Sequence, residues 1–455
     1  MCSEAGLFKL RIYATKHENT MNTENSLLRA AVLFFGAVVL LTFLPACHFT
    51  HGQLDICRRI EGLPLTPVTG QPAGVVFEDP GTIKVMHGSG CAHMDKGSEI
   101  KIEQSIDIPI YANKAAVFLN GWKLTYSGGD HHVMGMATAL GKINVQPAKV
   151  TWQAYGALAD DGQDKTIDWC YYYTVVAWND VNLHAFVDQD DANYFCKSSG
   201  TPSGSDNFFY ASNGGTETAL SWFASFLSNG NFASGRTVAL LPRGFGFDWY
   251  PDDHHLLQVA YNLGHGETFI QDQPYKKGLG ELKPLPTPPT GRVGSDFVSW
   301  NTSTIFKDDD TRRDYSVGEF VSGMGGPDVD VVEPPFSILP YDGPPFFHAC
   351  LGEAAGIKKE DVVIDNVPYA YALPMLTGWE LGYGCEGDHH VREVGIWIDN
   401  LRYEKAPNAP TGILRYTVFS TLHDDSSNWG SYRYKASILG LRRLAGGVPV
   451  KGTTP

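Results

Sequence analysis

Three Asp-His-His triplets contain the residues of this chain that are best suited to metal chemistry. An apolar run with strand periodicity follows each triplet, and in a strand the Asp and the second His point to the same side. An Asp and a His at this spacing supply half of a metal site, which an acidic turn of the same repeat or a neighbouring repeat would complete. The candidate metal ligands are Asp130, His132, Asp253, His255, Asp388 and His390.

A structural role is the alternative, and it is the one we favour from the sequence. The Asp would accept a hydrogen bond from a His ring or a turn amide and thereby fix the start of the strand. Turn motifs of this kind are what tandem repeats usually share.

Paired aspartates at 160–161, 309–310 and 424–425 suggest calcium, because carboxylates and turn carbonyls are the oxygen ligands that this ion prefers. None of these turns has the spacing of an EF-hand loop. Calcium and a merely solvated turn therefore remain two open alternatives.

Repeated aromatic residues precede each triplet. They offer either a surface on which a sugar ring stacks or large apolar side chains for a core, and core packing is the favoured alternative. These candidate ligand-binding residues are Trp122, Tyr126, Phe245, Trp249, Trp379 and Tyr383.

The sequence has no recognisable nucleophile motif, no His-Glu-x-x-His and no phosphate-binding glycine loop. An enzyme also normally needs one asymmetric site rather than three equal copies. We therefore favour a protein without catalytic activity.

The strands and turns that must position these residues follow one sequence pattern, which occurs three times in the chain. An apolar run leads to Gly and an aromatic residue, then to a second aromatic residue and the triplet. An apolar strand, a connection, a further strand, an acidic turn and an aromatic strand follow the triplet. After the triplets, Met136, Thr138 and Leu140 match Val394, Ile396 and Ile398 at alternate positions, which indicates strands with one buried face. We expect an all-β fold of three tandem antiparallel β-sandwich modules, with short helical and loop insertions.

We place the boundaries of these segments by composition. A helix is expected at 217–227, where apolar residues recur at helical spacing, and a shorter one near His348. The segments are a leader at 1–47, a lead-in at 48–97, the first repeat at 98–180, an insert at 181–234, the second repeat at 235–325, a linker at 326–359, the third repeat at 360–442 and a tail at 443–455.

The formal charge of −15 argues against a nucleic-acid partner, because affinity for phosphates comes from Lys and Arg. The apolar run at 30–44 is short for a membrane span and typical of a signal peptide. It ends in Leu44-Pro45-Ala46-Cys47, which resembles the lipobox of bacterial lipoproteins and implies a lipid on Cys47. We expect an extracytoplasmic protein, either lipid-anchored at the cell surface or secreted.

Cysteine usage agrees with export. Of the eight cysteines, Cys2 and Cys47 fall in the leader, and the others form an even set that suits disulfides in an oxidising compartment. We expect sequential pairing, although the spacing leaves other connectivities open. The candidate pairs are Cys57 with Cys91, Cys170 with Cys196, and Cys350 with Cys385.

The order of strands in each repeat, ending in a strand such as YYYTVVAW, resembles that of the H-type lectin module. This resemblance implies a six-stranded sandwich, recognition of N-acetylgalactosamine-like sugars and a threefold arrangement of the copies. The Asp-His-His triplet is not part of that family's pattern, and the resemblance assigns no sugar-binding residue.

Together these features predict a cell-surface binding or adhesion protein that recognises a glycan or another surface component. A structural subunit of a surface layer or filament, which would self-associate, is the first alternative. A metal-dependent hydrolase is the second.

Overall fold

Antiparallel strands dominate this protein, and the predicted all-β class with sandwich-like modules is confirmed. The computed structural model describes residues 60, 62–70, 72–94, 99–126, 132–160, 166–180, 183–186, 206–212, 217–228, 238–249, 255–264, 267–269, 296–308, 314–326, 328–334, 337–338, 357–383, 389–406, 408–425 and 430–442. All of them lie in one compact unit, Gly52–Pro455. The predicted leader, with Cys47, lies outside the described residues.

Each repeat contains four principal strands in the order that the sequence predicts. In the first repeat these are β4 (Lys114–Tyr126), β5 (Val133–Gln146), β6 (Lys149–Asp160) and β7 (Ile167–Trp178). In the second they are β11 (Val238–Trp249), β12 (Leu256–Leu263), β14 (Asp296–Asp308) and β15 (Asp314–Gly325). In the third they are β19 (Tyr371–Gly382), β20 (Val391–Glu404), β21 (Gly412–Asp424) and β22 (Ser431–Leu441).

Two further strand positions extend every repeat, one beside the third principal strand and one beside the fourth. Beside the third lie β3 (Glu99–Asp107), β10 (Glu217–Ser228) and β18 (Lys358–Val367). Beside the fourth lie β2 (Ile83–Met94), β9 (Asp206–Ser212), and the pair β16 (Val329–Val332) and β17 (Ser337–Ile338). The remaining edge strands are β1 (Gly74–Asp79), β8 (His184–Phe186) and β13 (Glu267–Phe269).

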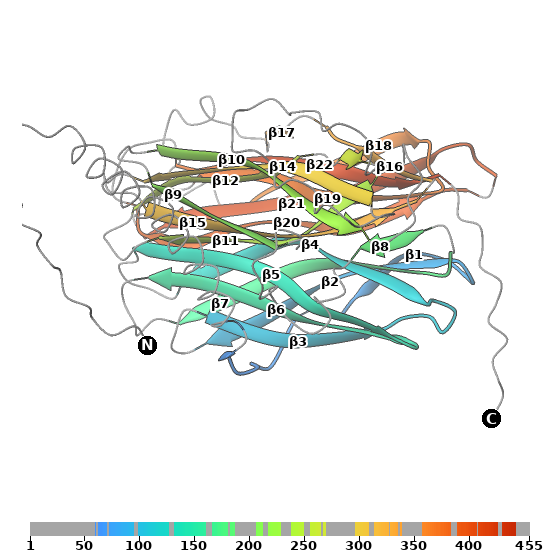
Figure 1. Ribbon diagram of the computed structural model, residues 1–455, viewed down its shortest axis with the longest axis horizontal. Coiled ribbons are helices and arrows are strands. Elements are labelled where there is room, and N and C mark those ends of the chain that lie inside the picture. Colours follow the sequence, from blue (N-terminus) through green and yellow to red (C-terminus); the bar gives the residue numbers. More distant parts are fainter. Residues whose placement is uncertain are drawn as a thin grey trace, which may run out of the picture. The chain divides into compact units, whose positions relative to one another are not determined.

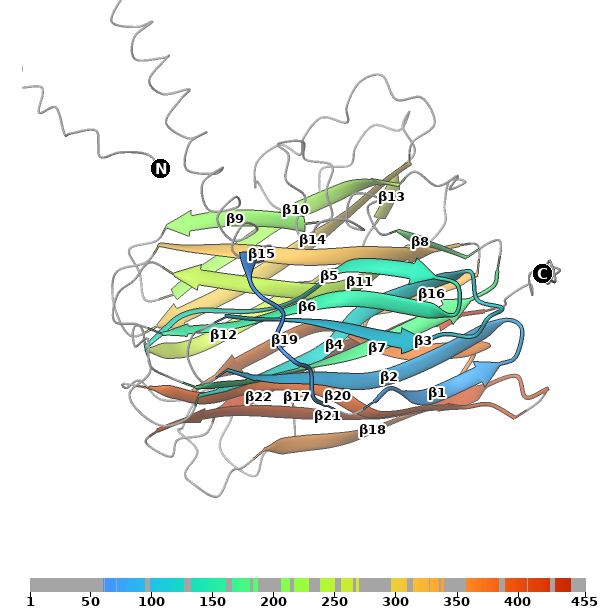
Figure 2. The ribbon, with the colours of Figure 1, turned by 90° about the horizontal axis from the view of Figure 1, so that it is seen from below.

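The three sheets do not coincide with the three repeats, because each sheet joins half of one repeat to half of another. The seams are antiparallel pairs of a first principal strand with a second principal strand: β4 with β20, β11 with β5, and β19 with β12. Figure 1 shows β4 beside β20, and Figure 2 shows β15, β11, β5, β6 and β3 in succession across one such sheet. The repeats are therefore linked in a closed cycle, and one hydrophobic core runs through all three.

Backbones approach very closely at these seams, which explains the repeated glycine. A β-bulge precedes Gly121, Gly244 and Gly378 in each first strand. Gly121 has φ of 141°, and a Cβ there would lie 2.2 Å from the Cα of Trp397 on the partner strand. A Cβ on Gly244 would lie 2.3 Å from the carbonyl oxygen of Thr138. A side chain at either position would force the seam apart.

Residues 217–228 correct one prediction, because they form strand β10 and not a helix. All twelve residues pair with β14 in an unbroken antiparallel register. The segment contains Thr218, Trp222, Phe223 and Phe226, residue types that suit strands, and pairing with the neighbouring strand overrides the local helical spacing. Most of the second expected helix, near His348, lies outside the described residues.

The disulfide between Cys91 and Cys170 corrects a second prediction. These residues face each other across β2 and β7, with Cα atoms 4.1 Å apart. Both are disulfide-bonded as expected, but the sequential pairs Cys57–Cys91 and Cys170–Cys196 are wrong because strand register brings distant cysteines together. Cys57, Cys196, Cys350 and Cys385 lie outside the described residues.

In the part of the chain that the structure describes, no helix has both the length and the apolar character needed to cross a bilayer.

We predict that Gly121→Ala weakens the seam between the first and third repeats. The new Cβ would meet the Trp397 backbone, and the positive φ disfavours any side chain, so we expect a loss of about 2 kcal/mol or more in the free energy of unfolding. Gly246→Ala is the matched control, since its Cβ would meet only the Ala137 Cβ at 3.5 Å. Equal urea midpoints for the two variants would contradict the seam explanation.

Candidate metal centre on the repeat axis

Three aromatic side chains, one from each repeat, meet where the seams converge. The ring centroids of Trp122, Phe245 and Trp379 lie 4.9–5.3 Å apart, and each side chain is at most 2% exposed. Each follows the seam glycine of its own repeat, so the three copies are arranged around a common line. We call this line the repeat axis.

The repeated aromatic residues pack in the core, as the favoured sequence alternative expects. Tyr126 is buried and its hydroxyl donates to the carbonyl of Leu158 at 2.6 Å, while Tyr383 is buried against another ring. The side chain of Trp249 lies outside the described residues. None of the described rings of this set presents a face on which a sugar could stack.

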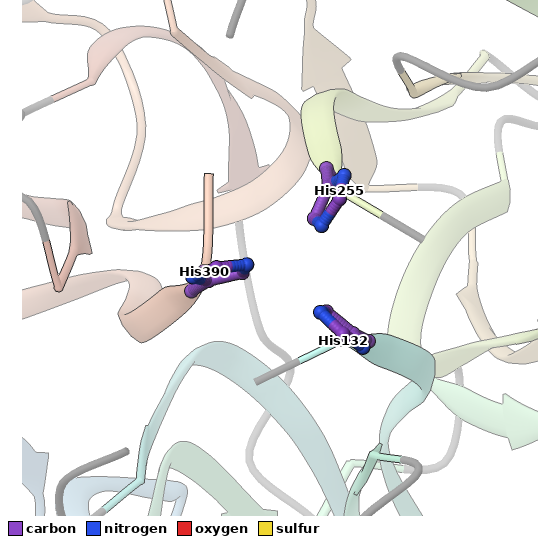
Figure 3. A group of neighbouring side chains, drawn as sticks. All are labelled: His132, His255 and His390. Carbon is purple, nitrogen blue, oxygen red and sulfur yellow. The ribbon is translucent and has the colours of Figure 1, made fainter. Parts of the chain in front are cut away.

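The second histidine of every triplet points to the repeat axis, and the three rings form a nearly equilateral group. The ring centroids of His132, His255 and His390 lie 5.0–5.1 Å apart. Figure 3 shows the three rings turned toward one another. One ring nitrogen from each residue lies within 4.8 Å of the other two. The three side chains are half-buried. The sequence assigned these residues to separate half-sites, whereas the fold brings them into one.

This geometry is close to that of a metal ion bound by three imidazoles. Nitrogens at the corners of a triangle of side 4.8 Å lie at most about 2.8 Å from its centre, and zinc–nitrogen bonds are about 2.0–2.1 Å. An inward shift of about 0.8 Å for each ring would therefore complete three bonds. Among the described residues, this is the only group of three or more His, Cys, Asp or Glu side chains with such spacing.

The first histidine of the third triplet has a different partner and a structural role. His389 Nδ1 lies 2.6 Å from Asp424 Oδ2, both side chains are at most 2% exposed, and Tyr383 stacks on the His389 ring with centroids 3.9 Å apart. Burial, together with the charge of Asp424, raises the pKa of Tyr383 well above its ordinary value. This cluster holds the start of β20 in place.

The acidic turn of the third repeat also reaches the axial histidine. Asp425 Oδ2 lies 3.5 Å from His390 Nδ1, and the Asp425 amide donates to the His390 carbonyl at 3.1 Å. A carboxylate on one imidazole nitrogen orients the ring and makes the other nitrogen a better metal ligand. Asp424 thus contacts His389, which has a structural role, and Asp425 contacts His390, which belongs to the axial group.

Strand register places an aspartate at the same position in all three repeats. The residue directly after each triplet faces an aspartate on the adjacent strand. Val133 faces Asp160, Leu256 faces Asp308 and Val391 faces Asp424. In the second repeat the equivalent pair is therefore 308–309 rather than the predicted 309–310. The predicted ligands Asp130, Asp253 and Asp388, and the first histidines of the first two triplets, lie outside the described residues.

The sequence offered the acidic turn of the same repeat as a complement to each half-site but did not assign Asp425 to His390. The available signal was that a His-His pair and an Asp-Asp pair each recur three times, before and after a pair of antiparallel strands. In the third repeat these carboxylates face imidazoles and not one another, which suits a nitrogen-bound metal better than calcium.

No protein-family model matches the chain, and no curated protein sequence matches it.

We predict that Asp424→Ala and Asp425→Ala have different effects on stability. The Asp424 variant leaves His389 buried without its partner and should lose about 2–4 kcal/mol of unfolding free energy. The Asp425 side chain is 34% exposed, so its removal should cost about 1 kcal/mol or less. Urea unfolding of the metal-free protein measures both, and equal losses would refute separate roles for the two aspartates.

Proposed function

We propose that this protein binds a transition-metal ion on the repeat axis through His132, His255 and His390, and that the ion joins the three repeats. The convergence of one histidine from each repeat carries the proposal. The rings belong to segments far apart in the chain, so only the folded seams gather them. An ion bound there stabilises the folded chain relative to the unfolded one, which cannot present the three ligands together.

The ligand type limits which ions fit. Imidazole nitrogens suit zinc, copper, nickel, cobalt and iron, whereas calcium prefers oxygen ligands. Three neutral imidazoles leave the charge of the ion uncompensated, and the Asp425 carboxylate at His390 offsets part of it. We use zinc as the reference ion because its geometry tolerates three protein ligands and one further ligand.

The wider role that we propose is an exported binding or adhesion protein at the cell surface. The Cys91–Cys170 disulfide supports an oxidising compartment, and the six strand positions in each repeat support the lectin-like assignment. The proposed partners are a glycan or a surface protein. A glycan array with the zinc-loaded protein tests this role, and a lack of binding to every glycan on the array would count against it.

Metal-dependent hydrolysis is the second candidate, and the number of axial ligands is the observation that favours it. Structural zinc sites are usually closed by four protein ligands, whereas catalytic sites have three and leave a position for water. Zinc-dependent turnover of activated esters or phosphodiesters, lost in His255→Ala, would favour the hydrolase. Zinc binding without turnover would favour the binding protein.

We predict that zinc raises the stability of the native protein and that His255→Ala removes most of this effect. At free zinc 100 times the dissociation constant, the gain should be about 2.7 kcal/mol. Thermal unfolding with zinc and with a chelator measures it, and elemental analysis gives the stoichiometry.

His93→Ala is the control for this experiment. His93, on β2, is not a member of the axial group, has a 52% exposed side chain and pairs with Asp168 at 2.7 Å. Zinc should raise the thermal stability of the His93→Ala variant by as much as it raises that of the native protein. If the two variants respond alike, or if the native protein does not respond, the axial site is refuted.

We further predict that Asp425→Asn weakens zinc binding at the axial site by about 10–100-fold, because the carboxylate that orients His390 is lost while the ring stays. Calorimetric titration of the folded variant measures this. An unchanged affinity would show that Asp425 does not orient the ligand.

A further inference from the structure

A polar cavity of about 190 Å³ lies beside the seam between the first and third repeats. Its polar lining comes from His87 and Ser89 on β2, Tyr172 on β7, and Asp399 and Asn400 on β20. The volume is large enough for several water molecules. It is therefore suited to a small ion with its hydration, and too small for most organic ligands.

Asp399 is the residue that breaks the equivalence of the three repeats. The second principal strands of the first and third repeats carry the same β-bulge, with a positive φ of 51° at Lys142 and 54° at Asn400. Gly141 precedes the first of these residues and Asp399 precedes the second. Asp399 and Gly141 each lie two residues after the residue that faces a seam glycine. In the second repeat the residue at the same distance is Gly264. Only the third repeat places a carboxylate there.

His87 and Asp399 are held at a separation that suits a bridging ion. His87 Nε2 and Asp399 Oδ1 lie 3.7 Å apart, which is too long for a hydrogen bond. A metal ion about 2.1 Å from both atoms would make an angle of about 120° between them, close to the tetrahedral range, without any movement of the side chains. The His87 side chain is only 7% exposed, whereas that of Asp399 is 39% exposed and accessible from solvent.

Both side chains are fixed by further hydrogen bonds, as metal ligands usually are. His87 Nδ1 lies 3.0 Å from Thr174 Oγ1, and the Asn120 side-chain amide donates to the same hydroxyl at 2.7 Å. The amide of Asn400 donates to Asp399 Oδ1 at 2.7 Å. Burial lowers the pKa of His87, partly opposed by Asp399 and the Ile398 carbonyl.

We propose that this seam cavity is a second metal site, in which His87 Nε2 and Asp399 Oδ1 bind a divalent transition-metal ion. Solvent fills the remaining coordination positions, and Ser89 and Asn400 line the same cavity. With two protein ligands, the site binds more weakly than the axial group and exchanges its ion readily. It goes beyond the axial metal centre, shares no residue with it and belongs to one seam only.

Asp399→Gly in the full chain is the decisive variant, because it restores the residue that the first repeat accommodates in the same bulge. We expect calorimetric titration with zinc to show two binding events for the native protein. The weaker event should be lost in Asp399→Gly, or weakened at least tenfold, with the tighter event unchanged. Asp399→Asn, which keeps the shape and removes the charge, should also weaken only the second event.

His390→Ala separates this proposal from the axial one, since it should lose the tighter event and retain the weaker. If the native protein shows one event that only His390→Ala removes, the seam site is refuted and the axial site stands. If only the event that depends on Asp399 is seen, the axial site is refuted and the seam site stands. Two events that both survive in Asp399→Gly would overturn the seam proposal.

Discussion

The architecture depends on the antiparallel pairing between the first principal strand of one repeat and the second principal strand of another. β4 with β20, β11 with β5, and β19 with β12 close a cycle, so no repeat completes its sheets alone. Each seam satisfies the backbone groups of two strand edges that would otherwise be exposed. The cost is a very close approach of backbones, which requires glycine at positions such as Gly121 and Gly244.

This pairing explains both groups of three side chains on the repeat axis, the aromatic rings and the imidazoles. The seams bring the three first strands together, and their buried aromatic rings fill the centre. The strand that pairs across the seam begins directly after an axial histidine, so the cycle that gathers the aromatic rings also gathers the imidazoles. Within the third repeat, the hairpin of β20 and β21 then brings Asp424 and Asp425 to the two histidines.

Local pattern was sufficient for the all-β class and for most of the strands, because alternation and turn residues act over a few positions. Met136, Thr138 and Leu140, and their counterparts in the third repeat, were correctly assigned to strands. Pairing between distant segments was not predictable from such patterns. The seams, the Cys91–Cys170 bridge, the strand at 217–228 and the meeting of His132, His255 and His390 all depend on it. The Asp-Asp and His-His pairs were visible in the sequence, but their relation required the hairpin register.

The position of a bound ion tests the central claim most directly. Anomalous diffraction from crystals grown with one equivalent of zinc should show a peak on the repeat axis, about 2.0–2.1 Å from a ring nitrogen of each of the three histidines. Well-ordered rings at these positions without a peak at saturating zinc, or rings that point away from one another, would contradict the account.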